Sequence, residues 1–345
     1  DMAIKASGSQ LAFSEIVSEF GDNDTSSLGG YRVRTGGATY PQSFAGGLSF
    51  SSLDTGIPTS GEIKFSDFYS KKLNVVIDFH SGSQEIGKSA KTRYNSNNVT
   101  IIGGYASRPT ITNGKKIFAY VNKTIGSPFN FSTSVVSLIT GTWDAGTDLN
   151  VNIGTSGKII GHGGAGGTGG NGGNNNGSPG LQGGSALGIQ YAPTTVTNNG
   201  RIQAGFGGGG GGAGRGQNVR VGKKSSQFRT SSGGGGGGGA GVPAGTAGPA
   251  GTGANWSSGS AGTAGQEQNS VSGGAGGQNA GAGGTSGGSD NTPTSANAPN
   301  GGNSGGASGG SGGANGYAIV TTAGSGPTIS GNAVVGRILT NTQPL

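Results

Sequence analysis

Tracts made almost entirely of glycine fill the second half of the chain and restrict what it can fold into. Of the 82 glycines in the 345 residues, 62 lie after residue 157. Glycine brings no side chain to a hydrophobic core and loses more backbone freedom on folding than any other residue. This half is therefore either a flexible linker or an ordered structure that rests on backbone contacts. Its main tracts lie at 161–173, 207–212, 233–239, 244–253, 273–277, 280–288 and 301–313.

The tract GGAGGTGGNGG at 163–173 places one other residue after each pair of glycines. A polyproline-II helix has about three residues per turn and no internal hydrogen bonds, so its backbone groups can bond neighbouring chains. A helix on the outside of a bundle of this kind can carry a side chain at every third position, whereas a central helix must be glycine alone. We therefore predict a polyglycine type II (PPII) helix bundle, with 207–212 and 233–239 at its centre.

Two other structures compete with this bundle. A flexible linker is the commoner explanation of glycine-rich sequence, but here uniform tracts alternate with irregular polar segments. Collagen needs glycine at every third position together with abundant proline, and the 12 prolines lie mostly outside the tracts. We therefore favour an ordered bundle. Its predicted scaffold glycines include Gly163, Gly166, Gly169, Gly172, Gly207, Gly210, Gly233 and Gly236.

The rest of the chain is rich in Val, Ile, Thr and Phe in short runs, which favours β-strands. The fold class predicted is a mainly β N-terminal half plus the polyglycine-II bundle in the C-terminal half, with very little α-helix. Asn113-Gly114 is typical of a two-residue hairpin turn, and the strands around it suggest an antiparallel sandwich. The predicted regions are an N-terminal attachment module at 1–75, an antiparallel β domain at 76–157, the glycine-rich bundle with its loops at 158–316 and a strand-like tail at 317–345.

A short internal echo lies within the first 75 residues. SGSQLAFSE at 7–15 resembles SGEIKFSD at 60–67. Each copy ends in serine and an acid, which can cap a following helical turn. The repeat predicts two related turns within one N-terminal module.

Few residues in this chain suit catalysis or metal binding. There is no cysteine, so a disulfide framework or a thiolate site is excluded, and this absence suits assembly in a cytoplasm. The run 82–89 satisfies GxxxxGKS, but we expect no helix after it and therefore a basic hairpin loop in place of a phosphate cradle. His80 and His162 make a poor metal set, and for His162 we expect surface packing or a sugar contact. We predict no enzyme, no cofactor and no metal.

The net charge of +7 is concentrated in one part of the chain. Residues 158–345 contain eight Lys or Arg but only Glu267 and Asp290 as acids, and six of the eight cations lie between Arg201 and Arg229. Such a patch favours polyanions, and a lone tryptophan among glycine and serine favours a binding anchor. A solvated loop and a covering of the bundle's side are the competing interpretations. The receptor-binding candidates are Arg215, Arg220, Lys223, Lys224, Phe228, Arg229, Trp256, Asn175 and Asn291.

Three sequence elements, taken in order, carry a resemblance to a known family. A strand leads into GHGGAGGTGGNGG from Gly161, NNGRI follows at 198–202, and a polyglycine run begins at Gly207. This order resembles the receptor-recognising adhesin at the tip of T-even-like bacteriophage long tail fibres, over roughly 145–320. The resemblance implies a polyglycine-II bundle whose distal loops bind outer-membrane receptors. The N-terminal segment looks like a module common at the start of phage tail proteins, and it does not obviously match the adhesin's attachment region.

These observations together predict a bacteriophage tail-fibre adhesin located on the virion. Its expected partners are a host outer-surface receptor, protein or glycan, and other phage tail or fibre proteins bound through the N-terminal module. No nucleic-acid partner is expected, and no stretch is long and apolar enough for membrane insertion. The alternatives are a structural virion tail protein without receptor binding and an ice-binding polyglycine-II protein.

Overall fold

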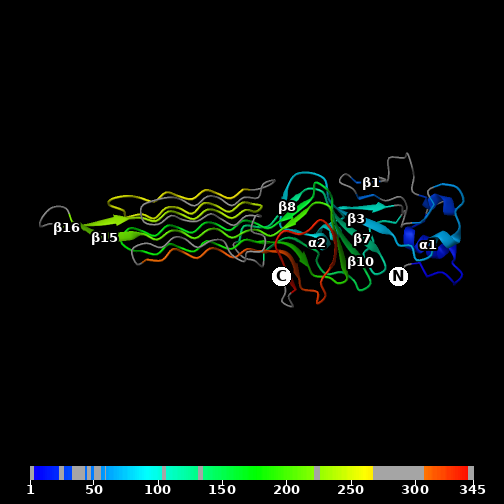
Figure 1. Cartoon of the computed structure of the whole chain (residues 1–345). Coiled ribbons are helices and arrows are strands. Elements are labelled where there is room, and N and C mark those ends of the chain that lie inside the picture. Colours follow the sequence, from blue (N-terminus) through cyan, green and yellow to red (C-terminus); the bar gives the residue numbers. More distant parts are fainter. Residues whose placement is uncertain are drawn as a thin grey trace.

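The computed structural model describes residues 4–22, 27–32, 43–44, 48–49, 56–58, 60–102, 106–130, 135–220, 226–266 and 307–340. Figure 1 shows an elongated molecule with helix α1 near one end, β-sheets in the middle and long glycine-rich segments on the other side. These segments lie side by side and lead to strands β15 and β16 at the far end. The predominance of β structure and the scarcity of helix agree with the sequence prediction.

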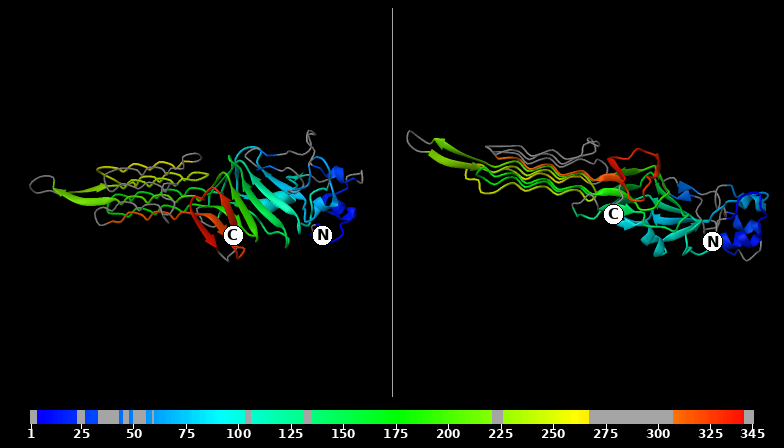
Figure 2. Two further views of the ribbon diagram at one scale, coloured as in Figure 1. Left: turned by 45° about the vertical axis from the view of Figure 1, so that its right-hand side comes forward. Right: turned by 90° about the horizontal axis from the view of Figure 1, so that it is seen from below.

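Three parallel stacks of strands form the middle of the molecule, and the chain winds through them in turn as a β-solenoid. Each coil contributes one strand to each sheet, and equivalent strands of successive coils pair in parallel. Figure 2 shows the strands following one another in chain order from the N-terminal end toward the glycine-rich segments. The first four coils consist of β3 (Asn74–Phe79), β4 (Glu85–Ile86) and β5 (Lys88–Ser89); β7 (Lys116–Val121), β8 (Thr124–Gly126) and β9 (Val136–Ile139); β10 (Asp148–Ile153), β11 (Lys158–Ile160) and β12 (Ser185–Ile189); and β13 (Thr194–Asn198), β14 (Arg201–Gln203) and β17 (Tyr317–Thr321).

A last, thinner coil follows, made of β18 (Thr328–Gly331) and β19 (Arg337–Thr340). Between them Val335 forms an isolated parallel bridge with Gln203, so this coil also reaches the second sheet. The C-terminal region, in which we expected strand-like runs, therefore supplies β17 to the fourth coil and β18 and β19 to the fifth.

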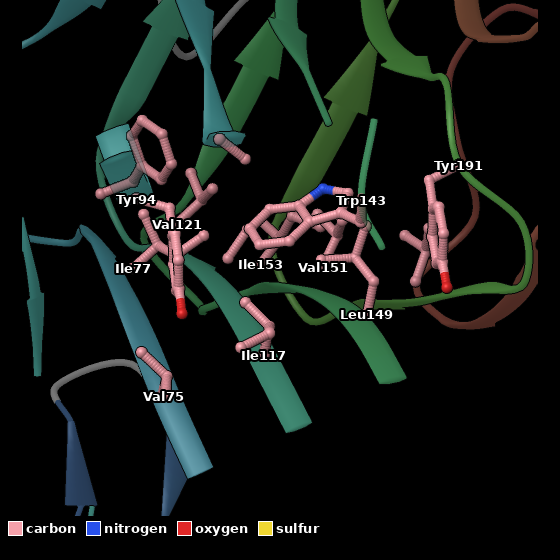
Figure 3. Close-up of a cluster of buried hydrophobic side chains, with 14 of the residues drawn as sticks. Val75, Ile77, Tyr94, Ile117, Val121, Trp143, Leu149, Val151, Ile153 and Tyr191 are labelled. Carbon is pink, nitrogen blue, oxygen red and sulfur yellow. The ribbon is translucent and has the colours of Figure 1, made fainter. Parts of the chain in front are cut away.

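The solenoid is held together by columns of apolar side chains that point inward from successive coils. Alternation along β10 buries Leu149, Val151 and Ile153 and leaves the intervening residues partly exposed, as expected of a strand with one face on a core. In the second sheet Ile125, Ile159 and Ile202 are fully buried at equivalent positions. Figure 3 shows Trp143 beside Leu149, Val151 and Ile153 of β10. The Trp143 indole nitrogen donates a 3.0 Å hydrogen bond to the carbonyl oxygen of Thr140.

The prediction of an antiparallel domain at 76–157 was wrong in its strand pairing. The strands β3, β7 and β10 pair in parallel, because their connections turn a corner into another sheet and do not reverse onto the same sheet. Antiparallel pairing within this range is seen between β3 and the edge strand β6 (Val99–Ile102). Asn113-Gly114 turns the chain into β7 without joining two paired strands, so the predicted hairpin is also absent there.

The expectation for the GxxxxGKS run was wrong as well. Its residues form β4 and β5, which belong to different sheets, and a helix does follow, α2 (Ala90–Asn95). The side chain of Ser89 caps this helix by accepting a hydrogen bond from the Thr92 amide, and Ala90 and Tyr94 are buried on its inner face. A short helix of this kind is stabilised by its cap and by two buried residues, without the long apolar stripe that sequence reasoning required.

The N-terminal module packs against the first coil of the solenoid. The described elements are α1 (Phe13–Phe20), the 3-10 helices η1 (Leu28–Tyr31) and η2 (Phe65–Phe68), and the short strands β1 (Ser43–Phe44) and β2 (Leu48–Ser49). The two echo sequences lead into α1 and η2. In each, an acid caps the start of the helix, with the Ala12 amide donating to Glu15 and the Lys64 amide donating to Asp67, both at 2.7 Å.

One hydrophobic core continues across the expected boundary at residue 75. It includes Phe20 and Phe68 of the N-terminal module together with Val75 of β3. A buried ion pair joins Lys115, just before β7, to Glu19 of α1, and Glu19 also accepts a 2.7 Å hydrogen bond from the Leu73 amide. Removing one partner of such a pair leaves an uncompensated buried charge, so the module is fastened to the solenoid by both polar and apolar contacts.

The glycine-rich segments are two insertions at one corner of the solenoid, between its second and third sheets. Residues 161–184 connect β11 to β12, and residues 204–316 connect β14 to β17. In the first coil the same connection is the single residue Gly87, and in the second it is residues 127–135. The solenoid can therefore close its coils with or without a long excursion at this corner.

Hydrogen bonds between neighbouring glycine segments repeat every third residue. The amides of Gly164, Gly167 and Gly170 donate to the carbonyl oxygens of Phe206, Gly209 and Gly212 at 2.7–2.8 Å. In return, the carbonyl oxygens of Gly164, Gly167 and Gly170 accept from the amides of Gly239, Gly236 and Gly233, each at 2.8 Å. The tract at 163–173 thus lies against both all-glycine runs, as its period predicted. The described segments are 161–172, 177–184, 205–214, 233–242, 244–252, 257–266 and 307–316.

Close approach between backbones explains why these segments need glycine. A Cβ atom added at Gly208 would lie 1.9 Å from the carbonyl oxygen of Ala165, and one added at Gly236 would lie 2.0 Å from that of Gly209. Neither contact can be relieved by rotating a side chain. Of the predicted scaffold glycines, Gly163, Gly166, Gly169, Gly207, Gly233 and Gly236 meet a neighbouring backbone oxygen within 2.1 Å in the same way, Gly172 does so at 2.6 Å, and Gly210 is buried in the same segment as Gly207.

Candidate functional site: the distal platform

Among the described residues, one β-ribbon and two turns form the end of the molecule farthest from the N-terminal module (Figure 1). The ribbon consists of β15 (Arg215–Arg220), which continues the segment 205–214, and β16 (Ser226–Ser231), which leads into 233–242. The turns are residues 171–176 and 252–257. We call these four parts the distal platform.

The ribbon has two different faces, set by the antiparallel register of its strands. Arg215 is opposite Ser231, and Gln217 is opposite Arg229. Because opposite residues of a pair share a face and successive residues alternate, Arg215 and Arg229 lie on the same face as diagonal neighbours. Phe228, opposite Asn218, lies on the other face.

The turn 171–176 runs along the base of β15 and is fixed to it by asparagines. The Gly216 amide donates a 2.6 Å hydrogen bond to Asn174, whose φ is +64°. Asn175, a predicted receptor contact, donates its side-chain amide to the carbonyl oxygen of Gly172 at 3.0 Å. In addition, Asn171 accepts from both the amide and the hydroxyl of Thr252, which ties this turn to the second one.

The turn 252–257 is fixed to the base of β16 in a similar way. The Asn255 side chain accepts from the Thr230 amide at 2.7 Å and donates to the carbonyl oxygen of Phe228 at 3.0 Å. The Trp256 amide donates to the carbonyl oxygen of Thr230 at 3.1 Å, and Ser257 forms a parallel bridge with Ser231. Both outer edges of the ribbon are therefore bonded to turns at its base.

Two large rings on the platform are exposed to solvent. Trp256 is 56% exposed, and Phe228 is 52% exposed. The Arg229 guanidinium lies over the Trp256 ring, 4.8 Å from its centroid, in a cation–π arrangement. Exposed aromatic rings of this kind, held by a bonded backbone, are typical anchors of binding sites.

The structure brings most of the predicted binding residues to this end of the molecule. Arg215, Phe228, Arg229 and Trp256 are exposed or half-buried there, and Asn175 is exposed but engaged in holding its turn. Arg220 is the last residue of β15. The remaining three candidates, Lys223, Lys224 and Asn291, lie outside the described residues.

Sequence reasoning missed the residues that hold the platform together, namely Asn171, Asn174, Thr230, Thr252 and Asn255. The three asparagines could have been found from the sequence, because each lies beside a glycine or close to the end of a glycine tract. Asparagine side chains at such positions commonly stabilise turns by hydrogen bonds to the backbone.

The idea that His162 makes a surface or sugar contact was wrong. Its side chain is fully buried where the first insertion leaves β11. The His162 amide donates to the Ser127 hydroxyl at 2.7 Å, and the Phe129 ring lies 5.5 Å away from the imidazole. Burial lowers the pKa of His162, although its contact with the Gly163 carbonyl opposes this shift. His162 is thus a packing residue at the base of the glycine segments.

Few features elsewhere in the described residues suggest chemistry. No group of three or more His, Asp or Glu side chains there is placed to hold a metal ion. A groove of about 650 Å³ lies beside α2, between Lys88, Thr92 and Arg93 on one side and Pro128, Val135 and Ile139 on the other. No helix in the part of the chain that the structure describes is long and apolar enough to cross a membrane.

The molecule thus presents a cationic and aromatic platform at the end of a stalk of glycine segments. In a comparison with known families, residues 75–340 match the family described as phage tail fibre adhesin Gp38. The chain belongs to this family, and as a tail fibre adhesin it is a virion-associated protein. The match begins at β3 and extends through the last coil, so the N-terminal module lies outside it. No curated relative and no solved structure matches.

Proposed function

We propose that this protein recognises a receptor on the host cell surface through the distal platform. The observation that carries the proposal is the gathering of exposed Phe228, exposed Trp256 and two arginines at the end of the stalk. This end of the molecule is the one farthest from the N-terminal module (Figure 1). The module itself, which is fused to the first coil, is the proposed attachment to other tail or fibre proteins of the virion.

The glycine segments are proposed to be polyglycine-II helices that form a bundle. Two observations support this assignment. Hydrogen bonds between segments recur every third residue, which matches the period of this helix. Moreover, none of the described glycines at 161–172, 205–214 or 233–241 has a positive φ, as a left-handed helix of the polyproline-II type requires.

The bundle is proposed to act as a rigid support for recognition. Each strand of the ribbon continues directly from a fully buried glycine segment, and both ribbon edges are hydrogen-bonded to turns. A loop that is ordered before binding loses less entropy when a ligand arrives. Several copies on one virion would further strengthen attachment through avidity.

Binding of the purified protein to intact cells of a susceptible strain tests the proposal. We expect Trp256→Ala to weaken binding by roughly tenfold or more, as is typical of an aromatic anchor. Ile111→Ala is a matched control, because Ile111 lies outside the platform and is 57% exposed, almost the same as Trp256.

A second variant removes the ribbon without disturbing the glycine segments. Replacing residues 216–230 with Asn-Gly retains Arg215 and Ser231, which are directly paired, and joins them by a two-residue turn. We expect this variant to fold and to lose cell binding. Equal binding by both variants and the unchanged protein would exclude the platform as the receptor site, and the absence of any cell binding would exclude the adhesive function.

A further inference from the structure

We infer that the distal platform recognises a phosphorylated saccharide of the bacterial outer surface. This inference rests on the proposed function, because it names the chemical class of the ligand for the same site. It depends on the charge of the platform, on the positions of its arginines and on the kind of surface around them.

The described residues of the platform include cations and no acids. Between Lys158 and Glu267 the sequence contains no Asp or Glu, so every residue of the ribbon and of both turns is neutral or cationic. The chain nevertheless places Arg215 and Arg229 in the ribbon. Among the described residues, no ion pair involves Arg215 or Arg229. A negatively charged ligand is the partner that such a surface complements.

The two arginines are arranged to bind one anionic group. Arg215 and Arg229 share a ribbon face as diagonal neighbours, a spacing that long side chains can bridge. Arg229 is also held in place by the Trp256 ring, 4.8 Å from its guanidinium. A guanidinium that stacks on a ring can still donate hydrogen bonds from the N–H groups in its plane. Pairs of these N–H groups match the spacing of two oxygens of a phosphate or carboxylate.

The surface around these arginines fits a sugar better than a protein. On the side of the arginines, the exposed large apolar residue of the described platform is Trp256, which lies against Arg229, and polar Gln227 is exposed nearer the tip. Phe228 and Asn218 are exposed on the opposite face of the ribbon. Protein interfaces of ordinary size have a broader apolar core. Isolated rings that stack on the C–H face of a sugar, together with amides that bond its hydroxyls, are the groups that saccharide recognition requires.

The test measures binding of the full-length protein to lipopolysaccharide purified from a strain to which it adheres. The lipopolysaccharide is used intact and after removal of its phosphates with hydrofluoric acid. We expect dephosphorylation to weaken binding by roughly tenfold or more, as the loss of charge-assisted hydrogen bonds predicts. The double variant Arg215→Gln/Arg229→Gln should bind both preparations equally weakly, and binding by the unchanged protein should decrease as salt is added.

Arg337→Gln is the matched control. Arg337 lies in the last coil of the solenoid, and its guanidinium also stacks on a ring, 4.7 Å from the centroid of Tyr317. The control should bind like the unchanged protein. This result would show that the double variant loses binding because the platform loses charge, and not because an arginine–ring pair is lost.

Each other outcome overturns the inference in a distinct way. Equal binding to intact and dephosphorylated lipopolysaccharide would show that the phosphate of the saccharide is not recognised. Adhesion to cells that disappears after protease treatment of the cells, without binding to purified lipopolysaccharide, would identify a protein receptor and leave the adhesive function intact. Failure to bind cells at all would overturn the proposed function as well.

Discussion

The solenoid and the glycine segments are built from the same chain by opposite means. In the solenoid, inward side chains such as Ile125, Ile159 and Ile202 stack in a buried column, and the backbone pairs along sheets. In the glycine segments the backbone itself is the packed surface, with hydrogen bonds between segments at every third residue. The comparison teaches that glycine is the packing residue of one region and a turn residue in the other.

The largest expected effect comes from adding a side chain to the glycine region. In Gly236→Val, the new Cβ would meet a backbone oxygen at 2.0 Å, and the Gly236 backbone is hydrogen-bonded to Gly167 and Gly248 of two neighbouring segments. We expect a loss above the roughly 1–3 kcal/mol of an overpacked side-chain core, together with protease cleavage within 161–266.

Limited proteolysis and thermal denaturation followed by circular dichroism measure this loss. Gly326→Ala is the control, because a Cβ at this position meets nothing within 4 Å. Unchanged protease resistance in Gly236→Val would show that the segments are not packed backbone to backbone.

A smaller effect is expected when a methyl group is removed from the solenoid. Ile159→Val creates a small cavity in the column between Ile125 and Ile202, and such changes cost about 0.5–1.5 kcal/mol. Chemical denaturation should show this loss while the glycine segments keep their resistance to protease. If Ile159→Val exposed the glycine segments as fully as Gly236→Val does, the two regions would not differ in how they are stabilised.

The smallest effect concerns pH at the junction of the two regions. Burial lowers the pKa of His162 below its usual value of 6.5, so the unfolded chain binds a proton more readily than the folded chain. The contribution of neutral His162 to the free energy of unfolding is therefore fully present above about pH 6.5 and is lost as the pH falls below this value. His162→Asn should reduce this loss, as measured by melting temperature between pH 7 and pH 5.

His80→Asn provides the comparison for this experiment. Burial also lowers the pKa of His80, with Asp78 opposing and Lys123 reinforcing the shift, but His80 lies in the first coil, away from the junction. A pH dependence that His162→Asn leaves unchanged would mean that the junction does not sense protonation of this residue.

The contact between the glycine tracts was predicted from the sequence because its signal is local. The period of three at 163–173 and the uniform runs from Gly207 and Gly233 are visible without knowing any distant contact, and these tracts do lie against one another. Exposed Trp256 and Phe228 were likewise found from their polar surroundings. The asparagines that bond the turns were missed, because their role depends on which strand each turn meets.

The solenoid was not predicted, since its pairing partners are far apart in the sequence. A weak signal existed in the short runs before Gly87, Gly126 and Gly161, each of which ends in isoleucine and glycine. These runs lie at the same corner in successive coils. Insertions of very different length at that corner hide the repeat, so short strands with turn residues looked like hairpins.

The arrangement of hydrogen bonds in the glycine segments also determines how the molecule carries force. A particle held at the distal platform pulls along the length of these segments, whereas the bonds that join them run across that direction. The load is then shared by many bonds in shear, and no single bond opens before its neighbours. A stalk of this kind resists extension although it contains almost no side-chain core.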